Sequence, residues 1–148
     1  MSEAAPIVLD AVSHAYGRGS LRREVLHEVS AEIGEGEVVL FTGPSGSGKT
    51  TLLTLVGALR STQEGSLEVL GRELRGANEK RLVEVRRRIG YVFQAHNLLD
   101  SLSALENVEI ALELHPEARR KRRRAKEMLE SVGLGDHMTQ LPRTLSGG

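Results

Sequence analysis

Hydrophobic and polar residues alternate along the first part of the chain. The alternation runs through residues 7–16 and again through 25–33, with a short Gly, Ser and Arg loop around 17–20 between them. A period of two is typical of half-buried strands, so this region predicts two antiparallel strands. After a turn at 34–37, a short and mostly apolar run at 38–42 predicts a buried parallel strand.

The spacing changes to a helical one in the next segment. Apolar residues between positions 50 and 59 recur three and four apart, which predicts a helix directly after a glycine-rich loop. Together with the strand at 38–42, this order of elements predicts an α/β architecture. The same reasoning gives the later elements: strands at 65–70 and 89–93, and helices at 79–88, 103–114 and 117–132, the last with Gly133 at the C-cap.

Composition narrows the class of protein. The 148 residues carry no net charge and no cysteine, and only 3% of them are aromatic. The lack of cysteine excludes a disulfide scaffold, a thiol nucleophile and a zinc-thiolate site. Few aromatics argue against a protein that stacks single-stranded bases. No apolar run approaches the ~20 residues of a membrane span, and residues 1–6 do not resemble a signal peptide. We therefore expect one soluble, cytosolic domain.

Charge is distributed unevenly despite the zero total. The first 70 residues carry 5 basic and 9 acidic side chains, whereas residues 71–148 carry 15 and 11, and a basic run occupies 119–124. Such a run can be a patch for nucleic acid or an anionic membrane. The solvated face of the helix at 117–132 is the interpretation that we favour, so we expect no nucleic-acid partner.

The glycine-rich loop carries the strongest chemical signal. Residues 43–50 read Gly-Pro-Ser-Gly-Ser-Gly-Lys-Thr and match G-x-x-x-x-G-K-[ST], the Walker A motif. The loop lies between a predicted buried strand and a predicted helix, which is the context that the motif requires. Glycine lets the main chain approach phosphate closely, and successive N–H groups then bind the anion. A purely structural glycine turn is the alternative, which motif and context together disfavour.

Each polar residue of this loop has an expected role in binding ATP and Mg²⁺. The Lys49 ammonium should reach the β- and γ-phosphates as a catalytic cation, and the Thr50 hydroxyl should ligate Mg²⁺. Thr51 is expected at the α-phosphate. The predicted phosphate-binding residues are therefore Gly43, Ser45, Gly46, Gly48, Lys49, Thr50 and Thr51.

Three further features give the chain a family resemblance. Tyr16 ends the first alternating strand, Gln94 ends the run Ile89–Gln94, and Leu145–Gly148 read Leu-Ser-Gly-Gly. In this order around a Walker A loop they resemble the nucleotide-binding subunit of ATP-binding-cassette (ABC) transporters, from about Ile7 onward. The resemblance implies that Tyr16 stacks on adenine and that Gln94 is a catalytic and metal-binding glutamine. It also implies that Ser146, Gly147 and Gly148 belong to the signature motif, which closes over ATP held by a second subunit.

The resemblance also implies an architecture and partners. The fold would be that of a P-loop NTPase with an N-terminal antiparallel β subdomain, a parallel core sheet and a helical subdomain. The Walker A core would occupy about 1–93, and the Q-loop and helical subdomain about 94–148. Residues 91–99, together with 103–108, resemble exporter ATPases of the lipoprotein-release and macrolide-export group, in particular its heterocyst-glycolipid (DevA-type) branch. The resemblance implies that two copies form a homodimer on the cytoplasmic face of the inner membrane. This homodimer would bind a permease that works with a periplasmic adaptor.

Parts of the family's machinery are missing from the sequence. No apolar strand ends in Asp-Glu, so there is no Walker B motif, and the switch histidine and C-terminal strands are also absent. We therefore expect an N-terminal fragment of an incomplete domain that binds ATP without hydrolysing it.

Other functions are weighed against this one. A GTPase should show N-K-x-D, which the chain lacks, and no kinase lid or acceptor site is identifiable. A non-hydrolysing module that binds nucleotide or a permease remains an alternative. The five histidines show no metal-ligand spacing, and His96 is interpreted as a packing or interface residue of the Q-loop.

Overall fold

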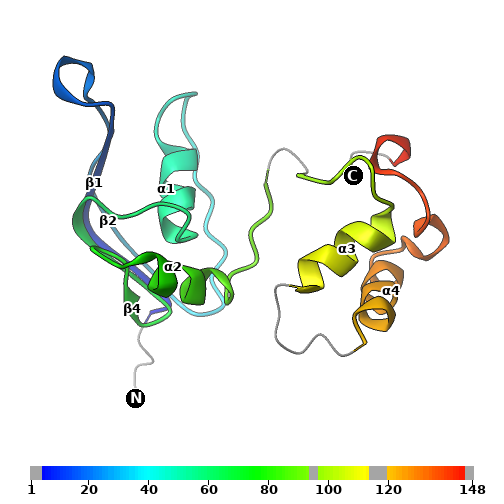
Figure 1. The fold of residues 1–148 in the computed structure, drawn as a ribbon. Helices are drawn as coiled ribbons and strands as arrows, with labels where there is room; N and C mark the ends of the chain where they lie inside the picture. Colours follow the sequence, from blue (N-terminus) through cyan, green and yellow to red (C-terminus); the bar gives the residue numbers. More distant parts are fainter. Residues whose placement is uncertain (1–4, 94–96, 114–119, 146–148) are drawn as a thin grey trace. The chain divides into compact units, whose positions relative to one another are not determined.

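The computed structural model describes residues 5–93, 97–113 and 120–145. These residues belong to two compact units, the first ending at Tyr91 and the second beginning at Val92 (Figure 1). Within the described ranges, no helix has both the length and the apolar character needed to cross a bilayer.

The first unit is built on an antiparallel sheet. Its strand order is β2-β1-β3-β4, so β1 lies between β2 and β3. The two alternating strands of the sequence analysis are confirmed, and the strand expected at 65–70 is confirmed one residue earlier. The strands are β1 (Ile7–Tyr16), β2 (Arg23–Ile33), β3 (Glu64–Val69) and β4 (Arg72–Glu73), and a 3-10 turn, η1 (Gly19–Leu21), joins β1 to β2.

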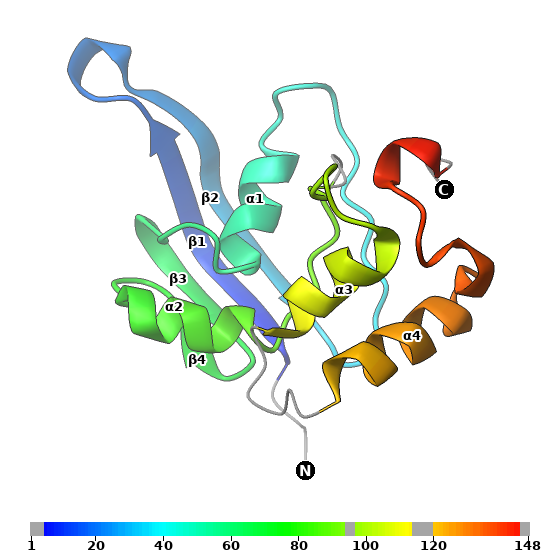
Figure 2. The same cartoon turned by 45° about the vertical axis from the view of Figure 1, so that its right-hand side comes forward.

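Two helices cover one face of this sheet (Figure 2). These are α1 (Lys49–Val56), which follows the glycine-rich loop, and α2 (Glu79–Arg86). Asn78 caps α2 because its side chain accepts a hydrogen bond from the Arg81 amide at 3.0 Å. The helices bury their apolar side chains against the strands in one core, formed by Leu9, Val12, Leu26, Leu52, Leu55, Ala58, Leu67, Val69, Leu74, Leu82 and Val85.

The second unit packs α3 (Ala104–Glu113) against α4 (Lys121–Ser131), and the turns η2 (Gly135–His137) and η3 (Pro142–Thr144) follow. Both helices expected from the sequence are confirmed in their described parts. Ser103 and Glu106 form a capping box at α3, in which each side chain bonds the other's amide. The predicted C-cap glycine is confirmed too. Gly133 has φ +76°, and the amides of Gly133 and Leu134 bond the Glu130 and Leu129 carbonyls in a Schellman motif.

The basic run lies on α4 as far as it is described. Lys121 and Arg122 form ion pairs with Glu113 and Glu109 of α3, at 3.2 and 3.6 Å. Arg123 pairs along its own helix with Glu127 at 3.3 Å. These residues are exposed or half-buried and are paired with acidic neighbours, which supports the interpretation of this run as a solvated helix face.

Two predicted strands are wrong. Residues 38–42 and 89–93 are not strands, and no sheet pairing reaches either segment within the described residues. Val38 is 98% exposed, Leu40 83% and Val92 96%. A buried parallel strand needs neighbours that satisfy its N–H and C=O groups, and the described sheet ends at β2 and β4 without providing them. The apolar sequence alone therefore does not make these segments strands.

Candidate phosphate-binding site

The loop at residues 43–48 connects the extended segment 38–42 to the first turn of α1. Gly48 precedes the helix with φ +88°, and a Cβ atom there would lie 2.8 Å from the Val25 carbonyl oxygen. Only glycine fits such a left-handed and crowded position without strain. Gly46 also has a left-handed φ of +81°, but it faces open space. Glycine at 48 is therefore required both by its backbone conformation and by its close neighbours. At position 46 only the backbone conformation favours glycine, because no atom beyond its chain neighbours lies within 4 Å of a Cβ there.

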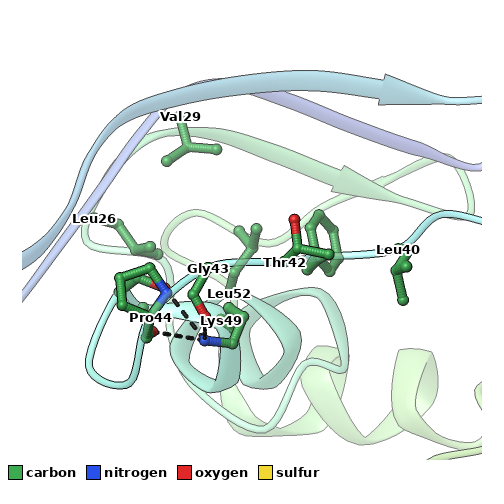
Figure 3. Close-up of a pocket in the computed structure, with 11 residues that line it drawn as sticks. Leu26, Val29, Leu40, Thr42, Gly43, Pro44, Lys49 and Leu52 are labelled. Carbon is green, nitrogen blue, oxygen red and sulfur yellow. Dashed lines mark hydrogen bonds between the residues drawn. The ribbon is translucent and has the colours of Figure 1, made fainter.

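The Lys49 ammonium folds back over this loop. Its Nζ atom donates hydrogen bonds to the carbonyl oxygens of Gly43 and Pro44, both at 2.8 Å, and lies 3.3 Å from Ser47 Oγ (Figure 3). These acceptors are neutral and solvent-exposed. A phosphate can therefore displace them, because a charged acceptor binds an ammonium more strongly than a carbonyl does.

The start of α1 adds backbone donors to the same place. The first amides of an α-helix have no intrahelical acceptor, and Gly48 supplies no side chain to cap them. The positive end of the helix dipole lies there as well. An ammonium, open amides and a glycine loop thus meet at one point, which is the chemistry of an anion-binding site.

A cleft with both polar and apolar walls is lined in part by this loop. It has a volume of about 460 Å³ and lies beside β2, the segment 40–44 and α1 (Figure 3). Apolar side chains form much of its lining: Leu26, Val29, Leu40, Phe41 and Leu52.

The other predicted residues of the loop differ in accessibility. The Thr50 side chain is exposed, as an expected ligand of a phosphate-bound metal should be, whereas Thr51 is buried. The Thr51 hydroxyl lies 3.1 Å from the hydroxyl of Tyr16. The structure therefore brings Tyr16 to the first turn of α1. Gln94, Ser146, Gly147 and Gly148 lie outside the described residues, as does His96.

Tyr16 is held among polar neighbours at the end of β1. The Arg60 guanidinium carbon lies 5.0 Å from the centre of its ring, and the His14 ring meets it edge-on at 5.1 Å. His14 is 5% exposed, and its Nδ1 atom has no hydrogen-bond partner among the described residues. Burial lowers the pKa of His14 below its ordinary value of 6.5, and the positive charge of Arg60 lowers this pKa further.

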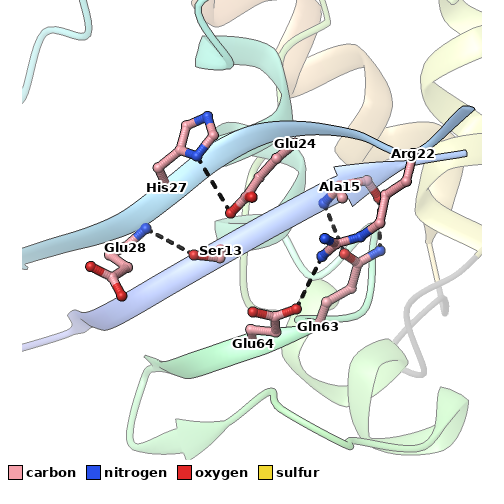
Figure 4. A network of polar contacts seen from close by, with 8 residues as sticks. All are labelled: Ser13, Ala15, Arg22, Glu24, His27, Glu28, Gln63 and Glu64. Atoms are coloured by element: carbon pink, nitrogen blue, oxygen red, sulfur yellow. Dashed lines mark hydrogen bonds and ion pairs between the residues drawn. The ribbon is translucent and has the colours of Figure 1, made fainter. Parts of the chain in front are cut away.

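Gln63 is a residue of this region that the sequence analysis did not identify. Its side-chain amide accepts a hydrogen bond from the Ala15 amide at 2.8 Å and donates one to the Ala15 carbonyl at 3.0 Å (Figure 4). Next to it, Glu64 forms an exposed ion pair with Arg22 at 3.2 Å. No local pattern could reveal this contact, because Gln63 and Ala15 are 48 positions apart in the sequence.

No cluster of three or more acidic or histidine side chains that could hold a metal occurs in the part of the chain that the structure describes. Among the described residues, the Thr50 hydroxyl is the predicted ligand for a metal that is also bound by phosphate oxygens.

Comparison with known sequences gives the family. The profile of the ABC transporter family matches residues 26–148. The chain belongs to the ABC transporter family. Solved ABC cassettes also share its fold: a dimeric post-hydrolysis structure of the ATP-binding cassette MJ0796 with ADP and Pi superposes with a TM-score of 0.84 at 35% identity, covering 95% of this chain and 63% of that chain. The predicted fold class, an ABC nucleotide-binding domain, is therefore confirmed.

ABC relatives with different printed roles are similar to the chain. The lipoprotein-releasing system ATP-binding protein LolD of Bordetella pertussis is 44% identical over 90% of this chain and 58% of its own length. The methionine import ATP-binding protein MetN 1 of Rhodococcus jostii is 41% identical over 96% of this chain and 42% of its own length. The chain thus spans between about two fifths and two thirds of the curated relatives that it matches.

Proposed function

We propose that this chain is the nucleotide-binding part of an ATP-driven ABC exporter and that it binds ATP with Mg²⁺ through residues 43–51. The observation that carries the proposal is the position of Lys49 Nζ, 2.8 Å from the Gly43 and Pro44 carbonyls at the start of α1. An incoming triphosphate would take over this ammonium and bind the amides that the helix leaves open.

Different residues of the chain would bind the phosphates, the metal ion and the base. Lys49 would neutralise the β- and γ-phosphates, and the exposed Thr50 hydroxyl would hold Mg²⁺ together with Gln94. Mg²⁺ suits this site because it is usually bound by few protein ligands and by substrate phosphates. When bound, it would neutralise charge on the phosphate oxygens. Tyr16, tied to α1 through Thr51, would stack on the base.

The membrane partners complete the proposal. Two copies would form a head-to-tail homodimer in which Ser146, Gly147 and Gly148 of each copy meet the nucleotide of the other. The Q-loop and the helical region of 94–148 would contact a permease at the cytoplasmic face of the inner membrane, with a periplasmic adaptor beyond it. We assign export, in the lipoprotein-release and DevA-type group, on the sequence of residues 91–99.

For the 148 residues alone we propose binding without hydrolysis. No apolar run of the sequence ends in Asp-Glu, so the general base that activates water in this chemistry has no candidate residue. Lys49 and the loop amides can bind ground-state phosphates, but they cannot deprotonate a water molecule.

Calorimetric ATP titration combined with a phosphate-release assay tests the proposal. We expect ATP to bind, release to stay at background, and Lys49→Ala to weaken binding by about tenfold or more, since a hydrogen bond to a charged group contributes ~1.5–3 kcal/mol. Lys80→Ala is the matched control, because Lys80 is an exposed lysine on α2. Absence of ATP binding would refute the function, and release that Lys49→Ala abolishes would refute the non-hydrolysing state.

The exporter assignment has its own test. Adjacent genes for a permease and a periplasmic adaptor would support it, whereas an adjacent gene for an importer's substrate-binding protein would contradict it.

A further inference from the structure

The side chain of Gln63 takes the place of a strand at the end of β1. The last residue pair between β1 and β3 is Ser13 with Glu64, so the β3 backbone does not reach Ala15. Gln63 fills this position with two hydrogen bonds, at 2.8 and 3.0 Å, to the amide and carbonyl of Ala15. Ala15 is 6% exposed, so its polar groups would otherwise be buried without partners on this side.

Ala15 is the residue directly before Tyr16. Fixing both backbone groups of Ala15 limits the positions that the next Cα atom can take, since consecutive Cα atoms are about 3.8 Å apart. The Tyr16 side chain is then held at two points: its hydroxyl lies 3.1 Å from the Thr51 hydroxyl, and the Arg60 guanidinium carbon lies 5.0 Å from the centre of its ring. Arg60 and Gln63 both lie in the connection between α1 and β3.

We propose that Gln63 is a positioning residue for nucleobase binding: it fixes the main chain at Ala15 and thereby holds the Tyr16 ring where a base stacks. This inference rests on the proposed function, because it assigns the base-binding half of the same nucleotide site. Gln63 does not touch the nucleotide and acts only through Tyr16.

The chemistry of the side chain explains why glutamine serves here. A primary amide carries one acceptor and one donor side by side, which matches the donor and acceptor of a backbone residue. Glutamate can accept from the Ala15 amide but places a second acceptor against the Ala15 carbonyl. Methionine has a similar length and neither strong group, so Gln63→Met removes both hydrogen bonds while largely retaining the volume.

Two ligands separate the contribution of the base to binding affinity from that of the phosphates. Binding of ATP and of inorganic tripolyphosphate to the 148-residue chain is measured by calorimetry. Gln63→Met should weaken ATP binding about fivefold, near the lower end of the cost of losing an aromatic stacking contact on a base. Tripolyphosphate binding should change less than about twofold, because Lys49 and the loop amides are untouched. Glu64→Gln is the matched control, since Glu64 is the exposed neighbour that pairs with Arg22 rather than Ala15.

A double-mutant cycle with Tyr16→Ala tests whether Gln63 acts through the tyrosine. In the Tyr16→Ala background, Gln63→Met should have no further effect on ATP affinity. Tyrosine fluorescence gives a second readout, because the chain has two tyrosines and no tryptophan. In a Tyr91→Phe background the emission reports Tyr16 alone, and Gln63→Met should reduce the change that ATP produces.

Circular dichroism establishes that each variant is folded, and Gln63→Glu, which keeps the bond from the Ala15 amide, replaces Gln63→Met if the latter unfolds. Equal losses for ATP and tripolyphosphate, or additive effects in the cycle, would overturn the role of Gln63 and leave the proposed function intact. A parent chain that binds neither ligand would overturn both.

Discussion

The Lys49 ammonium donates a hydrogen bond to the Gly43 carbonyl oxygen at 2.8 Å, across the loop that separates the two residues. The lysine is therefore already directed at the glycine loop instead of extending into solvent. Binding an anion would require an exchange of hydrogen-bond partners and no large movement of the side chain.

Lys49→Met should weaken phosphate binding by about tenfold or more without destabilising the fold. The carbonyls that Lys49 bonds are exposed, so water can replace the ammonium, and we expect the free energy of unfolding to change by less than about 0.5 kcal/mol. Urea denaturation of the variant and its parent measures this change. A loss of several kcal/mol would mean that Lys49 is primarily a structural residue of the loop.

Two glycine variants should separate the cost of a left-handed backbone conformation from the cost of a steric clash. Gly48→Ala places a Cβ 2.8 Å from the Val25 carbonyl at φ +88°, and we expect it to cost about 3 kcal/mol or more from the combined clash and left-handed conformation. Gly46→Ala has φ +81° with nothing near its Cβ, so only the conformational cost of about 1–2 kcal/mol applies. Urea denaturation of both variants gives the comparison, and equal losses would contradict the crowding at Gly48.

Removing Arg60 should raise the pKa of His14. Burial is the first cause of the lowered pKa and the charge of Arg60 the second, so Arg60→Met removes one of them. NMR titration of the His14 ring measures the change. Arg81→Met, an exposed arginine on α2, is the control and should leave the His14 pKa where it is.

The same histidine makes stability depend on pH. Because the folded pKa of His14 is depressed, the unfolded chain binds the proton more readily. The His14 contribution to the free energy of unfolding is therefore fully present above pH 6.5 and is lost as pH falls through the folded pKa. Thermal unfolding of the parent and His14→Gln between pH 7.5 and 5 tests this dependence. A parent and variant with identical pH profiles would refute it.

The capping box of α3 should hold the pKa of the Glu106 carboxyl group below its ordinary value. The Ser103 hydroxyl and amide both donate to Glu106, and these bonds lower the pKa of that carboxyl group below its ordinary value. Ser103→Ala should raise the Glu106 pKa and destabilise α3 by about 1 kcal/mol through the lost cap. NMR titration and thermal unfolding provide the two measurements. Ser101→Ala, an exposed serine before the helix, is the control.

Features encoded by neighbouring residues could be predicted from the sequence. The alternation at 7–16, the loop before α1 and the Gly133 cap each depend on a few consecutive side chains, and all three occur as expected. The contacts of Tyr16 with Thr51 and of Gln63 with Ala15 could not be predicted, because they join residues 35 and 48 positions apart.

Predictions also failed where an element depends on partners beyond its own sequence. Segments 38–42 and 89–93 have the composition of buried strands, yet a strand exists only when its backbone is paired. Composition describes what a segment can bury, whereas pairing depends on what lies beside it.

The backbone pairing of the first unit predicts that its amide hydrogens exchange with solvent at different rates. Between Ile7 and Ser13, β1 is paired on both edges, so in heavy water its amides there should exchange their hydrogens only when the sheet opens. Residues 38–42 belong to no ladder within the described chain, and their amides should exchange far faster. One small unit would thus hold a slow region and a fast one, with the glycine loop at the end of the fast segment.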